Sequence, residues 1–233
     1  MSAHRSRILV GPSEATCADV QEFYGLPQEK IRLVPAGVDP AFFEIGRERQ
    51  SAEVEPLILC ASTSHPHKGL VSLVRAFARF RREQPRFRLV ITGVRGFHAA
   101  AVERAIAEAG VADAVRLTGW IPREDLYKLF VRACAFVYPS TFEGFGLPVL
   151  EALAAGIPTA CSAIEPLAGM AGDAALQFRP DDEEALVRAL VRLATDEPLR
   201  ARLAAEGPRR AAGFTWEKAA QGILAAIRQA ASV

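Results

Sequence analysis

Short runs of apolar residues recur along the chain, and polar or amphipathic stretches separate them. Most runs lack a strict alternation of apolar and polar positions, which is typical of strands buried on both faces of a parallel sheet. The pattern therefore predicts eight strands, at residues 7–10, 31–37, 57–62, 87–92, 114–119, 135–140, 157–162 and 175–178.

Stretches between several of these strands have helical periodicity. Apolar positions recur from Leu70 to Phe80 at the spacing of one helix face, and Pro122 stands where a first helical turn would begin. Strands that alternate with helices in this way predict an α/β fold with a Rossmann-like, doubly wound parallel sheet. The expected helices are residues 67–83, 97–110 and 122–133, followed after residue 181 by a helical tail with breaks at Pro198, Gly207–Pro208 and Gly213.

The first fifty residues differ from the rest in organisation. They contain a strand, a helix over residues 13–25 and a second strand, and then residues 38–56, which are polar and irregular like a linker. We expect residues 1–50 to be the remnant of one domain together with a linker, and residues 51–233 to form a second domain. The main sheet should begin near Leu57.

Composition narrows the class of protein. The chain has 233 residues, a net charge of +1 and 50% hydrophobic residues, which is an ordinary globular composition. The near-neutral charge disfavours a dedicated nucleic-acid binder, and the basic cluster Arg79–Arg88 is typical of a solvated helix end. No apolar run approaches the roughly 20 residues of a membrane span. We expect a cytoplasmic protein with at most peripheral membrane association.

Cysteines and histidines give no strong metal signal. The cysteines form no C-x-x-C pair, and free, buried thiols are the expected state. His65 and His67 lack a nearby third ligand, so we expect no metal site and no cofactor.

The segment "YPSTFEGFGLPVLEALAAGIPTACS", residues 138–162, combines a strand end, a glycine-rich turn and a helix start. In open α/β sheets, ligands bind at the carboxyl ends of the strands. Gly144 and Gly146 would let backbone amides approach a ligand closely. A helix that begins near Gly146 or Leu147 would point its positive end at the turn, which suits an anion such as a diphosphate.

Two glutamates flank this turn eight positions apart, Glu143 and Glu151. Carboxylates are suited to accept hydrogen bonds from the hydroxyls of a sugar or a ribose. Eight helical residues span about 12 Å, more than the roughly 5–9.5 Å that separates glycosidase carboxylates. The spacing favours two contacts along an extended ligand, although a capping Glu143 and a surface Glu151 remain an alternative.

Residues 139–162 resemble the signature of the family 4 glycosyltransferases, retaining enzymes of the GT-B fold that use nucleotide-sugar donors. Further segments that resemble the same family are "HKGL", "LVITG", "VRLTGWIPREDLYKLFVRACAFVYPS" and the closing "FTWEKAAQGILAAI". The resemblance implies the C-terminal, donor-binding domain of such an enzyme, preceded by the tail end of its N-terminal domain. The implied activity is transfer of a hexose-type sugar, as in polysaccharide or glycoconjugate biosynthesis.

The resemblance also implies roles for individual residues. Glu143 would contact the donor sugar near its reacting carbon, and Lys68 would neutralise the departing diphosphate. Glu151 would hold the ribose hydroxyls. Further donor contacts are expected from the turn residues Gly144, Phe145, Gly146 and Leu147, from Trp120 and Ile121 beside the base, and from Gly93 at a strand end.

Two departures from the family pattern stand out. Relatives often place an arginine shortly before the lysine, whereas "STSHPHKG" has none, so either His67 assists or phosphate stabilisation is weaker. The chain also has no recognisable acceptor-binding domain, so we expect half an enzyme, whose N-terminal domain is missing or acts in trans. The acceptor is not identified. A non-catalytic nucleotide-sugar binding module, an inactive fragment and a generic α/β regulatory domain remain alternatives.

Overall fold

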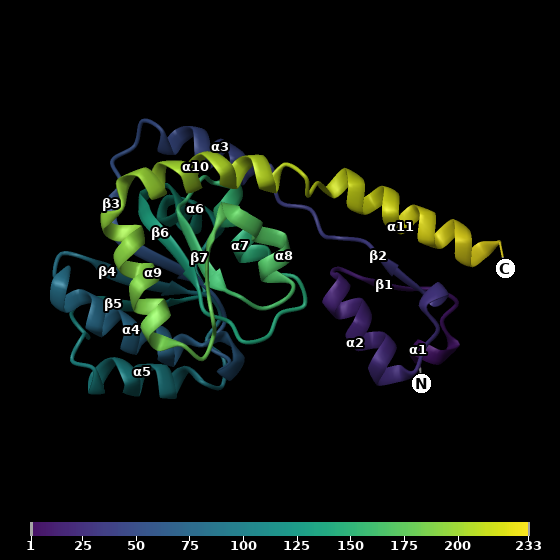
Figure 1. The fold of residues 1–233 in the computed structure, drawn as a ribbon, viewed down its shortest axis with the longest axis horizontal. Coiled ribbons are helices and arrows are strands. Elements are labelled where there is room, and N and C mark those ends of the chain that lie inside the picture. The colour runs from purple at the N-terminus through teal and green to yellow at the C-terminus, as the bar shows by residue number, and fades with distance from the viewer. Residues whose placement is uncertain (1, 233) are drawn as a thin grey trace.

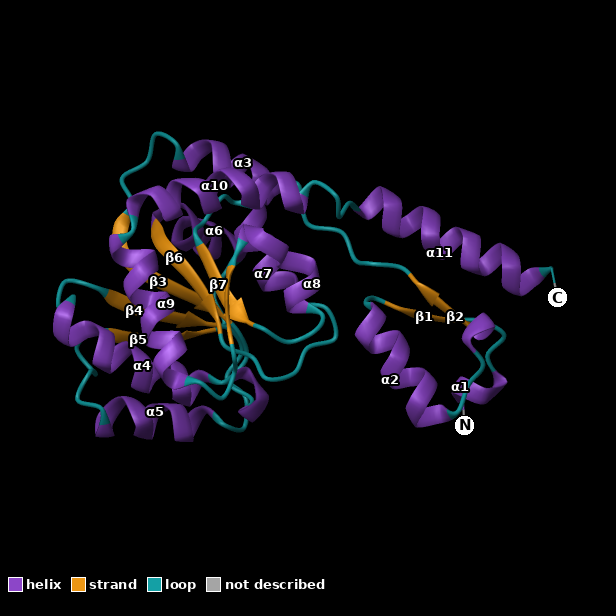
Figure 2. Ribbon diagram, viewed as in Figure 1, coloured by secondary structure: helices purple, strands orange, loops and turns teal. Residues whose placement is uncertain are grey.

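The computed structural model describes residues 2–232 and has a six-stranded parallel sheet at its centre. The strand order β5-β4-β3-β6-β7-β8 is that of a doubly wound Rossmann-like sheet, so the predicted fold class is confirmed (Figures 1 and 2). Every expected strand is present. The strands are β3 Glu55–Ala61, β4 Arg88–Thr92, β5 Val115–Gly119, β6 Ala133–Tyr138, β7 Thr159–Ser162 and β8 Leu176–Phe178.

The two central strands are the most apolar. All residues of β6 are buried, and so are Leu57 to Cys60 of β3. These strands lie side by side, yet β4 and β5 follow on one side of them and β7 and β8 on the other. The sheet therefore reverses its strand order between β3 and β6, and a crevice is expected where their carboxyl ends diverge.

Helices cover both faces of the sheet. On one face α4 packs against α5 and α9, and on the other α7 packs against α3 and α10. No helix within residues 2–232 combines the length and the apolar character needed to cross a membrane. The helices of this unit are α3 Ala41–Arg49, α4 Leu70–Glu83, α5 Ala99–Glu108, α6 Arg123–Arg132, α7 Leu147–Ala154, α8 Leu167–Ala171, α9 Glu183–Thr195 and α10 Glu197–Ala211, with 3₁₀ turns η2 Pro66–Lys68 and η3 Gly172–Ala174.

The segment expected to be an irregular linker is helical, so that prediction is wrong. Within it, α3 buries Phe42 and Ile45 in the main core and packs on α6 and α7. Arg49, at its end, donates from Nη1 to the carbonyl oxygens of Phe130, Val131 and Ala133 at 2.6, 2.7 and 2.8 Å. Packing of two apolar side chains and one long arginine outweighs the polar local composition.

The helical tail is confirmed, but the break expected at Gly207–Pro208 is wrong. Both residues lie inside α10. A Cβ on Gly207 would lie 2.7 Å from Leu153 O, so glycine permits a close crossing of α10 over α7. Packing of α10 on α7 opposes the break that a proline, which cannot donate a backbone hydrogen bond, would favour.

A smaller unit precedes the main sheet. Its strands β1 Leu9–Gly11 and β2 Ile31–Leu33 pair in parallel. The remaining elements are α1 Ser2–Arg5, α2 Glu14–Tyr24 and η1 Gln28–Lys30. The last helix, α11 Trp216–Ala231, extends away from the main sheet and runs along this unit (Figure 1).

Hydrogen bonds join α11 to the small unit. Arg32 Nε donates to Gln229 Oε1 at 2.8 Å, and Arg7 Nη1 donates to Ala230 O at 2.8 Å. The two connections to the main unit run beside each other, since Val38 N donates to Phe214 O at 3.1 Å. Residue 50 as a domain boundary stays a prediction, but the chain crosses between the two units near Gly37 and Phe214.

Candidate functional site

A cleft of about 460 Å³ opens at the carboxyl ends of β3, β4 and β6, where the strand order reverses. It is the place at which a doubly wound sheet binds its ligands. Five of the residues singled out in the sequence lie here together: Lys68, Gly93, Trp120, Ile121 and Glu143. The remaining lining residues are Ala61, Ser62, Thr63, Thr92, Val94, Leu126, Tyr138 and Pro148.

Lys68 reaches the cleft from the 3₁₀ turn that follows β3. The next residue, Gly69, has φ 65° and lies against the loop after β6. A Cβ at Gly69 would approach Pro139 O to 2.1 Å, so only glycine fits. This close approach holds the lysine-bearing turn against the glutamate-bearing loop.

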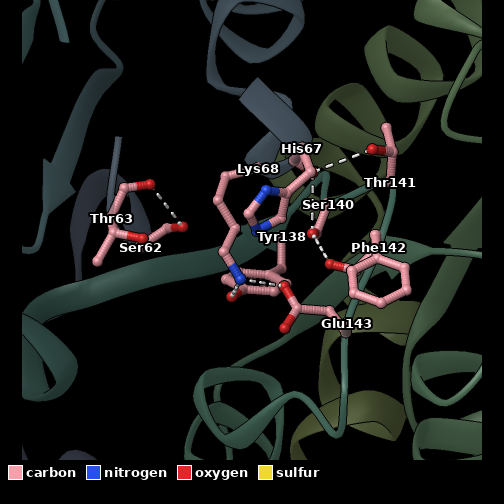
Figure 3. Close-up of polar contacts among 9 residues, drawn as sticks. All are labelled: Ser62, Thr63, His67, Lys68, Tyr138, Ser140, Thr141, Phe142 and Glu143. Atoms are coloured by element: carbon pink, nitrogen blue, oxygen red, sulfur yellow. Dashed lines mark hydrogen bonds and ion pairs between the residues drawn. The ribbon is translucent and has the colours of Figure 1, made fainter. Parts of the chain in front are cut away.

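Lys68 and Glu143 form an ion pair inside the cleft. Lys68 Nζ lies 2.6 Å from Glu143 Oε1, and the two side chains are 14% and 9% exposed. Lys68 Nζ also donates to the Tyr138 hydroxyl at 3.3 Å and lies 5.6 Å from the centre of that ring. Figure 3 shows the lysine and the glutamate pointing toward one another beside Tyr138.

The surroundings of Tyr138 keep its hydroxyl neutral. Burial raises the pKa of Tyr138 far above its ordinary value, and the negative charge of Glu143 adds to the effect. A neutral hydroxyl can accept from Lys68, which leaves Glu143 as the negative partner of that ammonium.

The backbone carbonyl of His67 ties the two loops together. It accepts from Thr141 N at 2.7 Å, from Ser140 Oγ at 3.0 Å and from Thr141 Oγ1 at 3.2 Å (Figure 3). The His67 ring stacks on that of His65, with centroids 5.8 Å apart. Burial and then the charge of Lys68 lower the pKa of His67, opposed by Glu143. This disfavours the charged imidazole as a substitute for the absent arginine.

The end of the cleft near Trp120 is partly apolar. Trp120 is 72% exposed and follows β5. Gly93, at the end of β4, has φ 137°, and a Cβ there would lie 2.3 Å from Ser62 O. Glycine thus lets the ends of β3 and β4 meet closely in the same cleft that Trp120 lines, and an exposed indole is suited to stack on a planar ring.

Glu151 lies apart from the cleft lining, in the second turn of α7. Burial raises the pKa of its carboxyl to about 7, and the positive charge of Arg123 opposes this rise. Among residues 2–232 no side chain is found that donates a hydrogen bond to this carboxylate. A half-buried carboxyl without a donor is available to hydroxyls brought by a ligand.

Gly144, Phe145 and Gly146 form the turn between Glu143 and α7, and Leu147 is the first residue of α7; none of these four residues lines the cleft. The Phe145 side chain is 9% exposed and packs edge-on against Phe214. Only the backbone of this turn is therefore available to a ligand. In the part of the chain that the structure describes, the amides of Phe145 and Gly146 have no protein acceptor.

Sequence reasoning missed several residues of the site. Tyr138 ends β6 directly before the glycine turn, and this position beside a reversal of strand order was the available signal. Ser13 and Thr16 of the small unit contact Gly144, and their only sequence signal is that of a helix N-cap.

The four cysteines are free and buried, as predicted. Within residues 2–232 no group of three histidine, cysteine or acidic side chains is placed to hold a metal ion. Donor binding without a metal stays a prediction.

Comparisons with known proteins agree with this geometry. The model of the family "Glycosyl transferases group 1" matches residues 42–210. The O-antigen chain mannosyltransferase B of Escherichia coli is 32% identical over 228 residues, which cover 93% of this chain and 59% of that protein.

Two solved structures share the fold. Sucrose-phosphate synthase from Thermosynechococcus elongatus superimposes with a TM-score of 0.79 at 26% identity, covering 94% of this chain and 57% of that one. Anabaena HepE, solved with UDP and glucose, gives 0.82 at 19% identity, covering 95% and 63%. The chain thus spans little more than half the length of the proteins that it matches.

Proposed function

The chain belongs to the group 1 glycosyl transferases, and from this membership we propose that it forms the donor-binding half of a retaining glycosyltransferase of family 4. In this proposal the enzyme transfers a hexose-type sugar from a nucleoside diphosphate sugar to an acceptor, as in polysaccharide or glycoconjugate biosynthesis. The observation that carries the proposal is the Lys68–Glu143 pair in the cleft where the strand order reverses.

Each part of the cleft suits one part of such a donor. Lys68 would neutralise the diphosphate as it leaves, in a partly dry site where a fixed charge is most effective. Glu143 would accept hydrogen bonds from the sugar, and Glu151 would do so from the ribose. The exposed ring of Trp120, with Ile121, would border the base. The structure of Anabaena HepE in complex with UDP supports UDP as one candidate, and GDP is the other.

The small unit supports a role for a further domain. Parallel sheets are normally covered on both faces and have more than two strands. Here β1 and β2 stand alone as a pair, with Val10 41% and Leu33 44% exposed. Ile223, Leu224 and Ile227 of α11 are 41%, 45% and 59% exposed. We propose that an α/β unit, covalent or in trans, completes this sheet and supplies the acceptor site.

The remaining expectations belong to the same proposal. The enzyme would act in the cytoplasm with at most peripheral membrane association. It would need neither a metal nor a cofactor and would bind no nucleic acid.

The test is a transferase assay of the 233-residue chain, alone and with an N-terminal α/β unit in trans, using UDP- and GDP-sugars and a panel of acceptors. Holding donor and acceptor together can contribute about 7–11 kcal/mol of barrier reduction, so we expect turnover only with both units. Turnover by the chain alone above about 1 per second would contradict the half-enzyme proposal. Nucleotide binding that never leads to transfer would favour the non-catalytic binding module.

A further inference from the structure

Two hydroxyls of the small unit bind one carbonyl of the glycine turn. Ser13 Oγ donates to Gly144 O at 2.7 Å, and Thr16 Oγ1 donates to the same oxygen at 2.9 Å. These residues are 131 and 128 positions apart from Gly144 along the chain. The contact is thus a direct link between the small unit and the loop that carries Glu143.

The Ser13 hydroxyl both donates and accepts a hydrogen bond at this point. Ser13 is 6% exposed and is the N-cap of α2, accepting from Thr16 N at 3.1 Å. Its single proton goes to Gly144 O, while the Thr16 hydroxyl, 3.1 Å away, supplies the second donor. The residue that begins α2 therefore also fixes the turn, so the position of the helix and the shape of the turn depend on each other.

The two hydrogen bonds to the Gly144 carbonyl determine where the backbone N–H of Phe145 points. The peptide between Gly144 and Phe145 is planar and trans, so its N–H and its C=O point in opposite directions. The C=O points at Ser13 and Thr16, and the Phe145 N–H consequently points away from the small unit. Among the described residues that N–H has no acceptor, which leaves it available for an oxygen of a bound anion.

We infer that Ser13 and Thr16 are positioning residues, which hold the 144–145 peptide so that the Phe145 amide meets the diphosphate of the donor. The inference rests on the proposed function for its ligand. Neither Ser13 nor Thr16 lines the cleft. They act by fixing the orientation of the 144–145 peptide. Donor binding therefore depends on the position of the small unit relative to the main one.

The central variant is Thr16→Val, which keeps the shape of the side chain and the N-cap but removes one donor. Thr16→Ser restores the hydroxyl. The matched control is Thr195→Val, because Thr195 Oγ1 donates to Val191 O at 2.8 Å far from the turn. A second pair is Ser13→Ala and Thr215→Ala, since Thr215 caps α11 as Ser13 caps α2, without contacting Gly144.

Calorimetry with UDP and GDP, and with uridine and guanosine, measures the effect on the full chain. We expect Thr16→Val to weaken diphosphate binding about two- to tenfold, the range of one lost hydrogen bond, and to leave nucleoside binding unchanged. Thr16→Ser and Thr195→Val should behave as wild type. Ser13→Ala should lose more diphosphate affinity than Thr215→Ala. Equal losses for nucleoside and diphosphate would indicate general damage and overturn the inference.

A measurement that needs no ligand separates this inference from the proposed function. The heteronuclear ¹⁵N NOE of the Phe145 and Gly146 amides should fall in Thr16→Val and not in Thr195→Val. If wild type bound no nucleotide, the proposed function would fail, and the NOE would still decide whether the hydroxyls hold the turn. Unchanged NOE values together with unchanged diphosphate affinity would overturn the inference.

Discussion

Lys68 Nζ lies 2.6 Å from Glu143 Oε1, and these two largely buried groups neutralise each other. The pair brings together two loops that follow different strands, β3 and β6. A diphosphate entering the cleft would offer Lys68 a second negative partner and free Glu143 for hydroxyls. The ion pair therefore prepares the cleft for an anion without leaving a charge unpaired beforehand.

Lys68→Ala should weaken binding of UDP or GDP more than binding of uridine or guanosine. A charge-assisted hydrogen bond contributes about 1.5–3 kcal/mol, so the expected loss is roughly ten- to a hundredfold for the diphosphate. The control is Lys128→Ala, which removes an exposed lysine paired with Asp125 at 2.8 Å. Calorimetry at low and high salt measures both. Equal losses for nucleoside and diphosphate would assign Lys68 a structural role.

Glu143→Gln and Glu151→Gln should separate sugar contacts from ribose contacts. At pH 8, above the Glu151 pKa of about 7, Glu151→Gln is expected to cost about 1–3 kcal/mol of affinity for the free diphosphate, the value of hydrogen bonds to a charged acceptor. Glu143→Gln releases Lys68 from its partner, so affinity for the free diphosphate should hold or increase while that for the complete sugar nucleotide falls. Similar losses of free diphosphate in both variants would refute this division of roles.

Glu151 should make the chain less stable as pH rises. Its pKa is raised by burial to about 7 in the folded state, so the folded state retains a proton that the unfolded state releases above about 4.5. The contribution of Glu151 to the free energy of unfolding is fully present below its pKa in the unfolded state. It declines as pH rises toward the folded-state pKa of about 7.

Urea unfolding of wild type and Glu151→Gln at pH 5 and pH 8 measures this decline. The variant should lack a decline on the order of 2 kcal/mol, whereas Glu108→Gln, at an exposed position, should retain it. Identical pH dependence in wild type and Glu151→Gln would contradict the raised pKa.

Gly69→Ala should destabilise the fold much more than Gly25→Ala. Both glycines have a left-handed backbone, with φ 65° and 61°, so both variants bear the strain of that conformation, about 1–2 kcal/mol. Only Gly69 also faces a backbone atom, Pro139 O, at 2.1 Å from the added Cβ, whereas Gly25 has open space. Thermal unfolding compares the two. Equal melting temperatures would show that the turns of Lys68 and Glu143 do not depend on this close approach.

The strands and the doubly wound parallel sheet were open to prediction because each strand is a local apolar run and α/β connections follow strong rules. Glu143, Lys68, Gly93, Trp120 and Ile121 lie in one cleft because each belongs to a connection that follows a strand of the same parallel sheet. Contacts between distant segments were not predictable. The hydrogen bonds from Ser13 and Thr16 to Gly144 O, and the short Lys68–Glu143 distance, depend on tertiary packing that no local sequence pattern encodes.

The segment around α3 was misjudged for a related reason. In the sequence, its apolar residues Phe42 and Ile45 lie among charged residues. Arg49 is held by hydrogen bonds to three carbonyl oxygens more than eighty positions away along the chain. Composition gives such a segment a polar appearance, while its tertiary contacts place it in the core.

The central claim is that this cleft binds the diphosphate of a nucleotide-sugar donor, and calorimetric titration of the wild-type chain tests it most directly. The dissociation constants for UDP and GDP are compared with those for uridine and guanosine at the same ionic strength. We expect at least one diphosphate to bind about ten- to a hundredfold more tightly than its nucleoside, the contribution of a charged partner such as Lys68. No heat with either diphosphate at millimolar concentration, or equal affinity for diphosphate and nucleoside, would contradict the claim.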